Sequence, residues 1–435
     1  MDIFGLITTL LFGIALISSD LTAQCQPTVD CNQNGVDDQC DLDFGTSDDC
    51  NGNMIPDECD IELLTSEDCN LDGIPDECNP GIDDLIGLGL AFGQGFGSSI
   101  DSTPQYTIVG APFDDLMGTD TGSANIFRRI GTQWMEEMKI FGIAAGIDDH
   151  FGTSVAVDDD LVAVGAPGKF LGRGAVYLYR RVGNGWWNYE GTVTAFDAQP
   201  GWSFGTSVDI HDGILVVGAT MSGTGNGSGA VYVFTRTENS WTEEAYIKSS
   251  NARSGDYFGT SISLSGDTLA AGAWCEDSIA PQSGAVYLFG RNGTSWTEEA
   301  ILKASNCEDS DFFGVTVALS GDTLAVGATG EDSSATGIGG NESYNYFGGS
   351  GAVYLFTRTE ATWTQTEYIK ASNTDGGDFF GKSLALSGDT LVVGAEYEDS
   401  NAIGIGGVES NNAASGSGAV YLFTRSGGTW SQSAY

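Results

Sequence analysis

The sequence has few positive charges and almost no histidine. Its 435 residues include 16 Lys and Arg against 60 Asp and Glu, a formal net charge of -44, and only two histidines. A surface of this sign repels phosphate backbones and attracts cations, so we expect no nucleic-acid partner. Charged residues are only 17% of the chain and hydrophobic ones 41%, a balance that is not typical of a disordered acidic tail.

Catalytic motifs are also missing. The sequence contains no G-x-S-x-G, no H-E-x-x-H and no glycine-rich phosphate loop between a strand and a helix. His150 and His211 lie in similar turn-like places, and we interpret each as a loop residue. Acidic pairs are so abundant that they do not indicate glycoside hydrolysis. We therefore predict no catalytic residues and no enzymatic activity.

No hydrophobic run beyond the amino terminus is long enough for a transmembrane helix. Residues 3–17 are largely apolar but too few to span a membrane comfortably, and Ala23 precedes a possible cleavage before Gln24. We predict a signal peptide over 1–23 and a secreted or cell-surface protein, with lipid anchoring at Cys25 as the alternative. The nine cysteines agree with export, because seven of them lie between Cys25 and Cys78.

Three acidic loops follow, beginning at residues 30, 49 and 68. They read DCNQNGVDDQCD, DCNGNMIPDECD and DCNLDGIPDECN. Each has an oxygen-bearing side chain at loop positions 1, 3, 5, 9 and 12 and a backbone carbonyl at position 7, an alternation that suits a hard cation with many oxygen ligands. We predict calcium as the cofactor and these ligands: Asp30, Asn32, Asn34, Val36, Asp38 and Asp41; Asp49, Asn51, Asn53, Ile55, Asp57 and Asp60; Asp68, Asn70, Asp72, Ile74, Asp76 and Asn79.

These loops resemble the calcium loops of thrombospondin type 3 and dockerin-type repeats. The cysteine at position 11 (Cys40, Cys59 and Cys78) matches the thrombospondin form in particular. Met54 departs from the usual position-6 glycine, and position 12 is never Glu. Because it has almost no apolar core, the segment 24–81 is expected to be a short rod whose order depends on metal and disulfides. An acidic, disulfide-tied spacer without calcium is the alternative.

From residue 96 onward one pattern recurs six times. Phe-Gly starts each copy, Gly-Ala follows, and an aromatic-rich segment such as GAVYLFTR comes next; the Phe-Gly pairs lie at 96–97, 151–152, 204–205, 258–259, 313–314 and 380–381. Segments such as SVALSGDTLAVGA alternate with a period of two across a Ser-Gly-Asp turn, which predicts a β-hairpin. Four short strands per copy, repeated six times, predict an all-β propeller over 82–435.

Phe-Gly followed by Gly-Ala-Pro, as at 110–112 and 165–167, resembles the FG-GAP repeat of the integrin α-chain propeller and of many bacterial secreted proteins. The resemblance implies a seven-bladed ring and extracellular recognition. Because six copies are present, we interpret the array as a truncated seven-bladed ring; a closed six-bladed ring is the rival. Integrin-type blades often carry a DxDxDG calcium loop, but here Ser-Gly-Asp turns stand in that place, so no calcium is predicted in the blades.

Two loops per blade are expected on one face: the loop after Gly-Ala and the loop before Phe-Gly. Both loops carry recurring acids. Their carboxylates could form a ring on this face that binds cations or a basic partner, or the acids could cap turns. The longest insertions, 330–350 and 396–417, also belong here. Recognition is commonly placed on such loops, and the candidate ligand-face residues are Glu331, Asp332, Tyr344, Tyr346, Glu398 and Asp399.

Cys275 and Cys307 lie in consecutive copies, one after Gly-Ala and one before Phe-Gly. On a propeller they could meet across a blade boundary, and we predict a disulfide between them.

The sequence therefore favours a secreted, non-catalytic adhesion or interaction protein. Its expected partner is a protein or glycan ligand at the cell surface or in the matrix. Two alternatives stay open: an extracellular enzyme or accessory part of a polysaccharide-degrading system, and a structural cell-surface component.

Overall fold

The computed structural model describes residues 93–435 except 132, 184, 224–226, 238–239, 403–404 and 410. These residues belong to one compact unit, Leu85–Tyr435. The predicted signal peptide (1–23), the three predicted calcium loops (30–41, 49–60 and 68–79) and their cysteines lie outside the described residues and stay predictions. Within the described ranges, no helix is long and apolar enough to cross a membrane.

Twenty-four strands form six sheets of four. Blade 1 contains β1 (Ser99–Ser102), β2 (Tyr106–Ala111), β3 (Ser123–Ile130) and β4 (Gln133–Ile140); blade 2 contains β5 (Ser154–Asp158), β6 (Leu161–Ala166), β7 (Ala175–Val182) and β8 (Trp186–Val193). Blade 3 contains β9 (Phe204–His211), β10 (Ile214–Ala219), β11 (Ala230–Thr237) and β12 (Ser240–Ile247); blade 4 contains β13 (Ile262–Ser265), β14 (Thr268–Ala273), β15 (Ala285–Asn292) and β16 (Ser295–Leu302). Blade 5 contains β17 (Thr316–Ser320), β18 (Thr323–Ala328), β19 (Ala352–Thr359) and β20 (Thr362–Ile369); blade 6 contains β21 (Phe380–Ser387), β22 (Thr390–Ala395), β23 (Ala419–Ser426) and β24 (Thr429–Ala434). Among the described residues, helix is confined to the single turn α3 (Lys169–Gly172).

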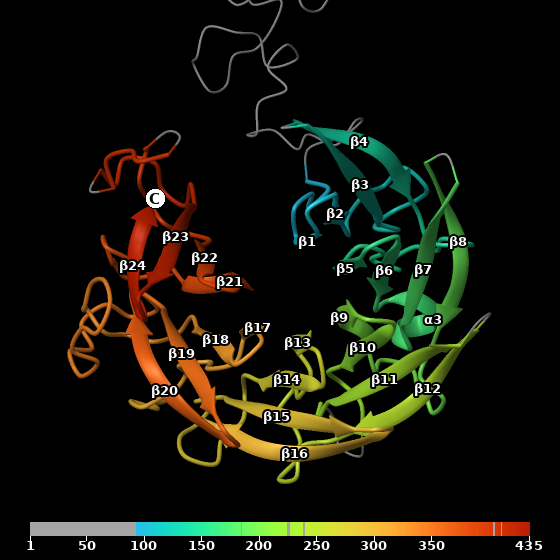
Figure 1. Cartoon of the computed structure of the whole chain (residues 1–435). Coiled ribbons are helices and arrows are strands. Elements are labelled where there is room, and N and C mark those ends of the chain that lie inside the picture. Colours follow the sequence, from blue (N-terminus) through green and yellow to red (C-terminus); the bar gives the residue numbers. More distant parts are fainter. Residues whose placement is uncertain are drawn as a thin grey trace, which may run out of the picture. The chain divides into compact units, whose positions relative to one another are not determined.

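Each blade is an antiparallel meander in which every strand pairs with the next along the chain. The Ser-Gly-Asp segments make tight turns between the first two strands, as where Ser265 pairs with Thr268 and Ser320 with Thr323. The blades are arranged around an axis, with the first strand of each blade innermost and the fourth outermost (Figure 1). The prediction of an all-β propeller of four-stranded blades is confirmed, with six blades present.

The second and third strands carry most of the buried residues in blades 1 to 5. All six residues of each second strand are buried, and so are the first five residues of the third strands β11, β15 and β19. Blades 2 to 5 pack against a neighbour on both faces, so a continuous apolar run is favoured there over alternation. Tyr287 and Tyr354, for example, are both 0% exposed.

Neighbouring blades are joined through the Phe-Gly motif. Phe of each motif contacts the aromatic strand of its own blade, as in the edge-to-face pair of Phe313 and Tyr354 at 5.4 Å. The backbone of the same Phe forms a parallel bridge with the glycine that precedes the third strand of the previous blade, as between Phe313 and Gly284. The motif therefore contacts the aromatic strand of its own blade through the Phe ring and the previous blade through its backbone.

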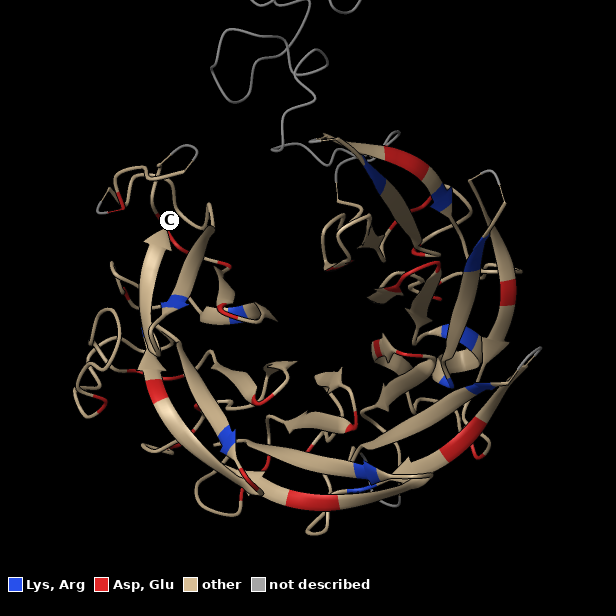
Figure 2. Cartoon of the chain, in the orientation of Figure 1, with Lys and Arg blue, Asp and Glu red and all other residues tan. Residues whose placement is uncertain are grey.

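A second tie lies at the outer strands. A Glu on the fourth strand of one blade accepts hydrogen bonds from an Arg and a Trp of the next blade: Glu137 from Arg181 and Trp187, Glu190 from Arg236 and Trp241, Glu244 from Arg291 and Trp296. Figure 2 shows the same arrangement, with acidic positions on outer strands beside basic positions on the strands next to them. Three of the chain's 16 Lys and Arg residues, Arg181, Arg236 and Arg291, thus connect neighbouring blades.

The array is open between its first and last blades (Figure 1). A cleft of about 930 Å³ lies there, lined by Gly97 and Ser98 on one side and by blade 6 residues such as Gly394 and Val420 on the other. The rival interpretation of a closed six-bladed ring does not describe this structure. The seventh blade stays a prediction.

Candidate interaction face

The loops after the second and fourth strands of every blade lie on one face, because successive turns of a meander alternate between its two ends. We call this the loop face. It carries the two sets of recurring acids, both long insertions and most of the residues singled out from the sequence. Its candidate function is recognition, so the exposure of each side chain decides what it can do.

The first set of acids comes as pairs after Gly-Ala, and the first member of each pair is buried. Asp114, Glu276, Glu331 and Glu398 are at most 2% exposed. Of the second members, Asp115 and Asp277 are exposed, and Asp332 and Asp399 are partly buried. Three of the first members are paired with a lysine from the end of the same blade: Asp114 with Lys139 at 2.6 Å, Glu331 with Lys370 at 2.7 Å, and Glu276 with Lys303. Burial is the largest single influence on the pKa of Glu276 and raises it, but the hydrogen bond and charge of Lys303 and the hydrogen bonds from Ser278 together lower the pKa below its ordinary value.

In blades 4 to 6 the buried Glu belongs to a network that repeats from blade to blade. An Asn before the Phe-Gly motif donates to the Glu and accepts from the tyrosine of the aromatic strand. Asn306 does so with Glu331 (3.1 Å) and Tyr354 (2.5 Å). The equivalent residues are Asn251 with Glu276 and Tyr287, and Asn373 with Glu398 and Tyr421. The recurring Asn, Glu, Tyr and Lys therefore hold the loop face together from inside.

The second set of acids caps turns. Asp149, Asp256, Asp311 and Asp378, each shortly before Phe-Gly, accept a hydrogen bond from the backbone N–H three residues earlier, at 2.6 to 2.9 Å. All four are at most 6% exposed. Burial raises the pKa of Asp311 to about 7 and that of Asp378 to about 6, with nearby carboxylates adding to the effect. These four residues therefore cap turns, the alternative to a ring of surface carboxylates. Their carboxylates are buried and not exposed to solvent.

The structure divides the six candidate ligand-face residues into three pairs. Glu331 and Glu398 are buried in the network and offer no surface for a ligand. Asp332 and Asp399 are partly buried, and each accepts a hydrogen bond from the glycine 17 positions further along its insertion, Gly349 at 2.8 Å and Gly416 at 2.7 Å. They shape the loops. Only the third pair, Tyr344 and Tyr346, is largely exposed, at 55% and 79%.

The insertion 330–350 is held in place by hydrogen bonds along its length. Ser334 N–H donates to Tyr344 O at 2.8 Å, and Phe347 N–H donates to Asp332 O at 3.0 Å. The side chain of Asn345 reaches Glu308 of the neighbouring loop at 2.5 Å. These hydrogen bonds define the conformation of the loop, and the two tyrosine rings are stacked on it with centroids 6.3 Å apart. Phe347, which follows them, is partly buried.

Insertion 396–417 has the same framework but not the tyrosines. Asn401 N–H donates to Asn411 O at 3.0 Å, and Ala414 N–H donates to Asp399 O at 2.9 Å. The positions of the tyrosine pair in the loop before it are occupied by Asn411 and Ala413. The exposed aromatic pair is therefore a property of blade 5 and not of the repeat.

Cys275 and Cys307 have free thiols in this structure, contrary to the disulfide expected from their spacing. Cys307 packs on the core between blades 4 and 5. The loops that carry the two cysteines lie side by side: Ser310 N–H donates to Pro281 O at 2.9 Å, and the rings of Trp274 and Phe312 are 5.2 Å apart. The two thiols are nevertheless not bonded to each other. Burial raises the pKa of the Cys275 thiol to about 11, which leaves it protonated and weakly reactive.

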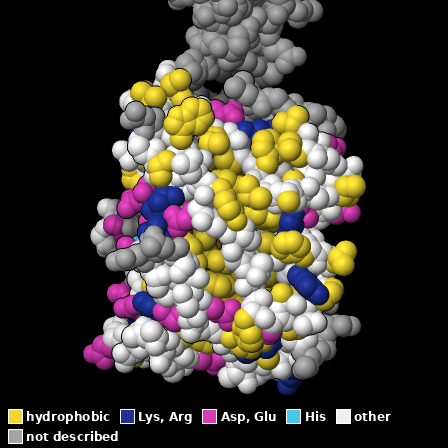
Figure 3. Space-filling view, turned by 90° about the vertical axis from the view of Figure 1, so that its right-hand side faces the viewer, with side chains coloured by type: hydrophobic (Ala, Val, Ile, Leu, Met, Phe, Trp, Pro, Cys, Tyr) yellow, Lys and Arg dark blue, Asp and Glu magenta, His cyan; other side chains and the backbone are white. Residues whose placement is uncertain are grey.

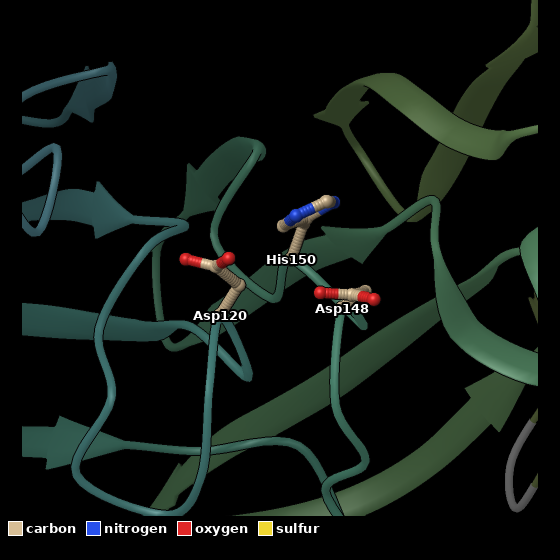
Figure 4. A group of neighbouring side chains, drawn as sticks. All are labelled: Asp120, Asp148 and His150. Atoms are coloured by element: carbon tan, nitrogen blue, oxygen red, sulfur yellow. The ribbon is translucent and has the colours of Figure 1, made fainter.

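His150 has two acidic neighbours, Asp120 and Asp148, with one potential ligand atom from each of the three within 4.8 Å of the others. Figure 4 shows that they come from two neighbouring loops of the loop face. His150 has a positive φ of 53°, but Tyr257, Phe312 and Phe379 have the same conformation before their own Phe-Gly motifs. His150 also packs edge-to-face on Phe113, as Phe379 packs on Tyr397. The arrangement follows from the fold, and we assign no metal to it.

The side of the array formed by blades 1 to 3 also exposes hydrophobic residues, among them Met135 at 53% and Trp186 at 69%. Figure 3 shows that hydrophobic side chains in this view are interspersed with charged and polar ones. This side therefore lacks the combination found on the insertion of blade 5, where two aromatic rings stack on an ordered loop.

The comparisons with known proteins agree with this architecture. The family model described as FG-GAP repeat matches residues 134–179, 187–234, 241–289, 296–356 and 363–423. Each matched segment begins on the fourth strand of one blade and ends on the third strand of the next, so the sequence repeat spans a blade interface. Integrin alpha-4 of Xenopus laevis is 27% identical over 301 residues, which are 66% of this chain and 27% of that protein.

The match thus spans about a quarter of the length of this relative. The five repeats together cover more than half of the present chain and follow its blades with an offset of one strand. The chain belongs to the FG-GAP repeat family and has an integrin-like β-propeller.

Proposed function

We propose that this protein is a secreted or cell-surface adhesion protein that binds a protein ligand through the loop face of its propeller, without catalysis. The observation that carries the proposal is the pair Tyr344 and Tyr346, exposed and stacked on an ordered loop of a single blade. Tyrosine offers a large contact area at a low cost in conformational entropy, which suits a protein interface.

The charges of the loop face support a non-catalytic role. The buried recurring acids form hydrogen bonds or ion pairs with lysines, amides and backbone N–H groups inside the blades. Their carboxylates are therefore not free to act as acid–base pairs. His150 lies between blades 1 and 2, whereas His211 ends β9 in blade 3 and is next to Asp212 at 3.7 Å. The similarity to integrin alpha-4 supports the adhesion class, because integrin α-chains share this repeat.

Calcium at the loops 30–41, 49–60 and 68–79 is part of the proposal. The alternating oxygen ligands of these loops support it, and the acidic chain would concentrate the cation. Calorimetric titration of the full chain with calcium, before and after Asp30→Ala, Asp49→Ala and Asp68→Ala are combined, tests it. We expect uptake at millimolar calcium or below in the parent chain and its loss in the triple variant. Equal heats for both proteins would overturn it.

The ligand site is tested with the double substitution Tyr344→Ala and Tyr346→Ala. The probe is an array of extracellular-matrix proteins and, on separate spots, glycans, incubated with the full chain. We expect binding to one or more protein spots and at least a tenfold loss of it in the double variant. Asn411→Ala, at the corresponding place in the insertion of blade 6, is the matched control and should bind like the parent. Unchanged binding by the double variant, or binding to glycan spots only, would contradict the proposal.

A further inference from the structure

Blade 3 departs from the network of buried polar residues that holds the loop face together in blades 4 to 6. Counted from the Phe-Gly and Gly-Ala motifs, three of its five network positions carry a different residue. Asp197 replaces the Asn, Trp202 replaces the capping Asp, and Ser222 replaces the buried Glu. The tyrosine and the lysine of the network are kept, as Tyr232 and Lys248. Blade 3 therefore has the lysine without the Glu that pairs with it in blades 4 and 5.

Lys248 forms no ion pair with any residue that the structure describes. Its ammonium group donates to the Ser228 hydroxyl at 2.6 Å and to the carbonyl oxygen of Gly229. At the equivalent place in blade 4, Lys303 is paired with the carboxylate of Glu276. A partly buried ammonium group without a carboxylate in contact carries a desolvation cost that is not offset. A ligand that supplies a carboxylate is favoured at this position.

A cavity lies at the changed positions of blade 3. Its volume is about 380 Å³, which is within the range of small-molecule sites. The guanidinium group of Arg253, at one side of the cavity, is already paired with Asp277 at 3.0 Å. The lining side chains that matter for a ligand are those of Asp197, Trp202, Tyr246, Lys248 and Arg253.

Asp197 contributes a negative charge to the same cavity. Its carboxylate accepts a hydrogen bond from the Tyr232 hydroxyl at 2.8 Å and forms no ion pair with Lys248 or with any other described cation. Burial is the largest influence on the pKa of Lys248 and lowers it, while the charges of Asp256 and Asp197 act in the opposite direction. The cavity is thus lined by one negative and one positive group that do not neutralise each other by contact.

Two aromatic side chains also line the cavity. Tyr246 is 41% exposed and packs on the ring of Tyr232 with centroids 5.1 Å apart, and Trp202 is partly buried. The face of an aromatic ring attracts an ammonium group. Trp202 stands where blades 2 and 4 to 6 have the capping Asp, so this aromatic wall is specific to blade 3 among these blades.

We propose that the cavity of blade 3 binds a small zwitterionic ligand with the chemistry of a free α-amino acid. The ligand carboxylate accepts from Lys248, as the Glu of blade 4 accepts from its own lysine. The ligand ammonium group faces Asp197 and the two aromatic rings. A ligand with both charges is attracted by both groups, whereas a ligand with a single charge is repelled by one of them. The site is separate from the tyrosine pair of blade 5, so one can fail without the other.

Ligand-observed saturation-transfer NMR on the full chain tests the chemistry. The probes are the free α-amino acids, with acetate and methylammonium as single-charge ligands and glucose as a neutral one. We expect at least one amino acid to bind with a Kd about tenfold or more below that of acetate, methylammonium and glucose. No binding of any amino acid at about 10 mM would overturn the proposal, and so would equal binding of acetate or a preference for glucose.

A variant that restores the network tests the place of the site. Ser222→Glu combined with Asp197→Asn gives blade 3 the Glu and the Asn of blade 4, so that the new carboxylate pairs with Lys248 and fills the cavity. We expect amino-acid binding to weaken about tenfold or more, with Tm equal to that of the parent or higher. Trp274→Ala, on a loop of blade 4, is the aromatic control and should bind like the parent. Binding that persists in the restored variant would overturn the proposal.

The single substitution Asp197→Asn keeps the test decisive if the restored variant does not fold. It removes the negative group and leaves Lys248 in place. We expect weaker binding of the amino acid and stronger binding of acetate, so that the preference between them falls to about one. An unchanged preference would show that Asp197 does not face the ligand and would contradict the proposal.

Discussion

Blades 5 and 6 have almost the same sequence and different surroundings. The segment GAVYLFTR occurs in both, at 351–358 and at 418–425, and both form an eight-residue third strand. Yet Val353 is 0% exposed and Val420 is 60% exposed. The comparison teaches that the repeat encodes a blade and both of its contact faces, while burial is decided by whether a neighbour is present. Four predictions follow, from the largest effect to the smallest; the first two compare blades 5 and 6 directly, and the other two concern loops of blade 5.

The buried ion pair gives the largest expected effect. Glu331→Gln leaves Lys370, which is 0% exposed, without its counter-charge, and we expect a loss of about 3–5 kcal/mol in unfolding free energy. In blade 6, Glu398 accepts from Tyr435 at 2.9 Å and from Asn373, but has no cation partner among the described residues. Glu398→Gln should therefore lose only about 1 kcal/mol. Chemical denaturation of the two variants checks this, and equal losses would contradict it.

Core packing gives the next effect. Leu355→Ala removes a side chain that is 0% exposed, and we expect a loss of about 3 kcal/mol. The equivalent Leu422 is only partly buried, so Leu422→Ala should lose less than half as much. Urea midpoints of the two variants measure the difference. A loss at Leu422 as large as that at Leu355 would mean that blade 6 is covered in solution.

The third prediction concerns the pH dependence of stability. The change in unfolding free energy over one pH unit is smaller than the losses expected at Glu331 and Leu355. Because the folded pKa of Asp311 is raised to about 7, above its usual unfolded value of about 3.9, the folded state holds this proton more tightly. The stability it contributes is present below about pH 4 and is lost as the pH rises through about 7, by at most about 1.4 kcal/mol per pH unit.

The variant Asp311→Asn keeps an acceptor for the N–H of Glu308 and does not ionise, so the decrease of Tm between pH 4 and 7 should become shallower. The carboxylates that face this group are Glu331, Glu308 and Asp332, and they are unchanged in the variant. Asp309→Asn, at an exposed neighbour, is the control and should leave the slope as it is. A variant slope equal to that of the parent would contradict the account.

The smallest effect on stability is expected at the tyrosine pair. Tyr344 and Tyr346 are exposed, and replacing both with Ala should change the unfolding free energy by no more than about 0.5 kcal/mol per site. Thermal unfolding of the double variant checks this against the parent. A large loss of stability would show that the pair supports its loop, and any loss of binding would then be indirect.

The strands, their number and the propeller could be predicted from the sequence because those signals are local. The Ser-Gly-Asp turns, the alternation before them and the apolar aromatic segments each lie within a few residues. The burial of the acids could not be predicted in this way, since the partner of Glu331 is Lys370, at the far end of the blade. A Lys follows the fourth strand at 303 and 370, but Lys248 occupies the same place in blade 3, where no Glu follows Gly-Ala, so this position does not by itself identify the pair.

The expected disulfide between Cys275 and Cys307 is not formed in this structure. Both residues occupy loops of the loop face, as expected, and these two loops are in contact through Trp274 and Phe312. The contact of two loops does not by itself give their cysteines the short Cβ–Cβ distance and the orientation that a disulfide requires.

The most direct test of the account is a comparison of hydrogen exchange in the two identical segments. Peptides that cover 351–358 and 418–425, each with its distinct flanking residues, have the same internal intrinsic exchange rates because their sequence is the same. Any difference between them therefore reports the opening of blade 5 against that of blade 6. The account predicts clearly faster deuterium uptake at 418–425. Equal protection of both segments would show that the face of blade 6 is already covered and would contradict the account.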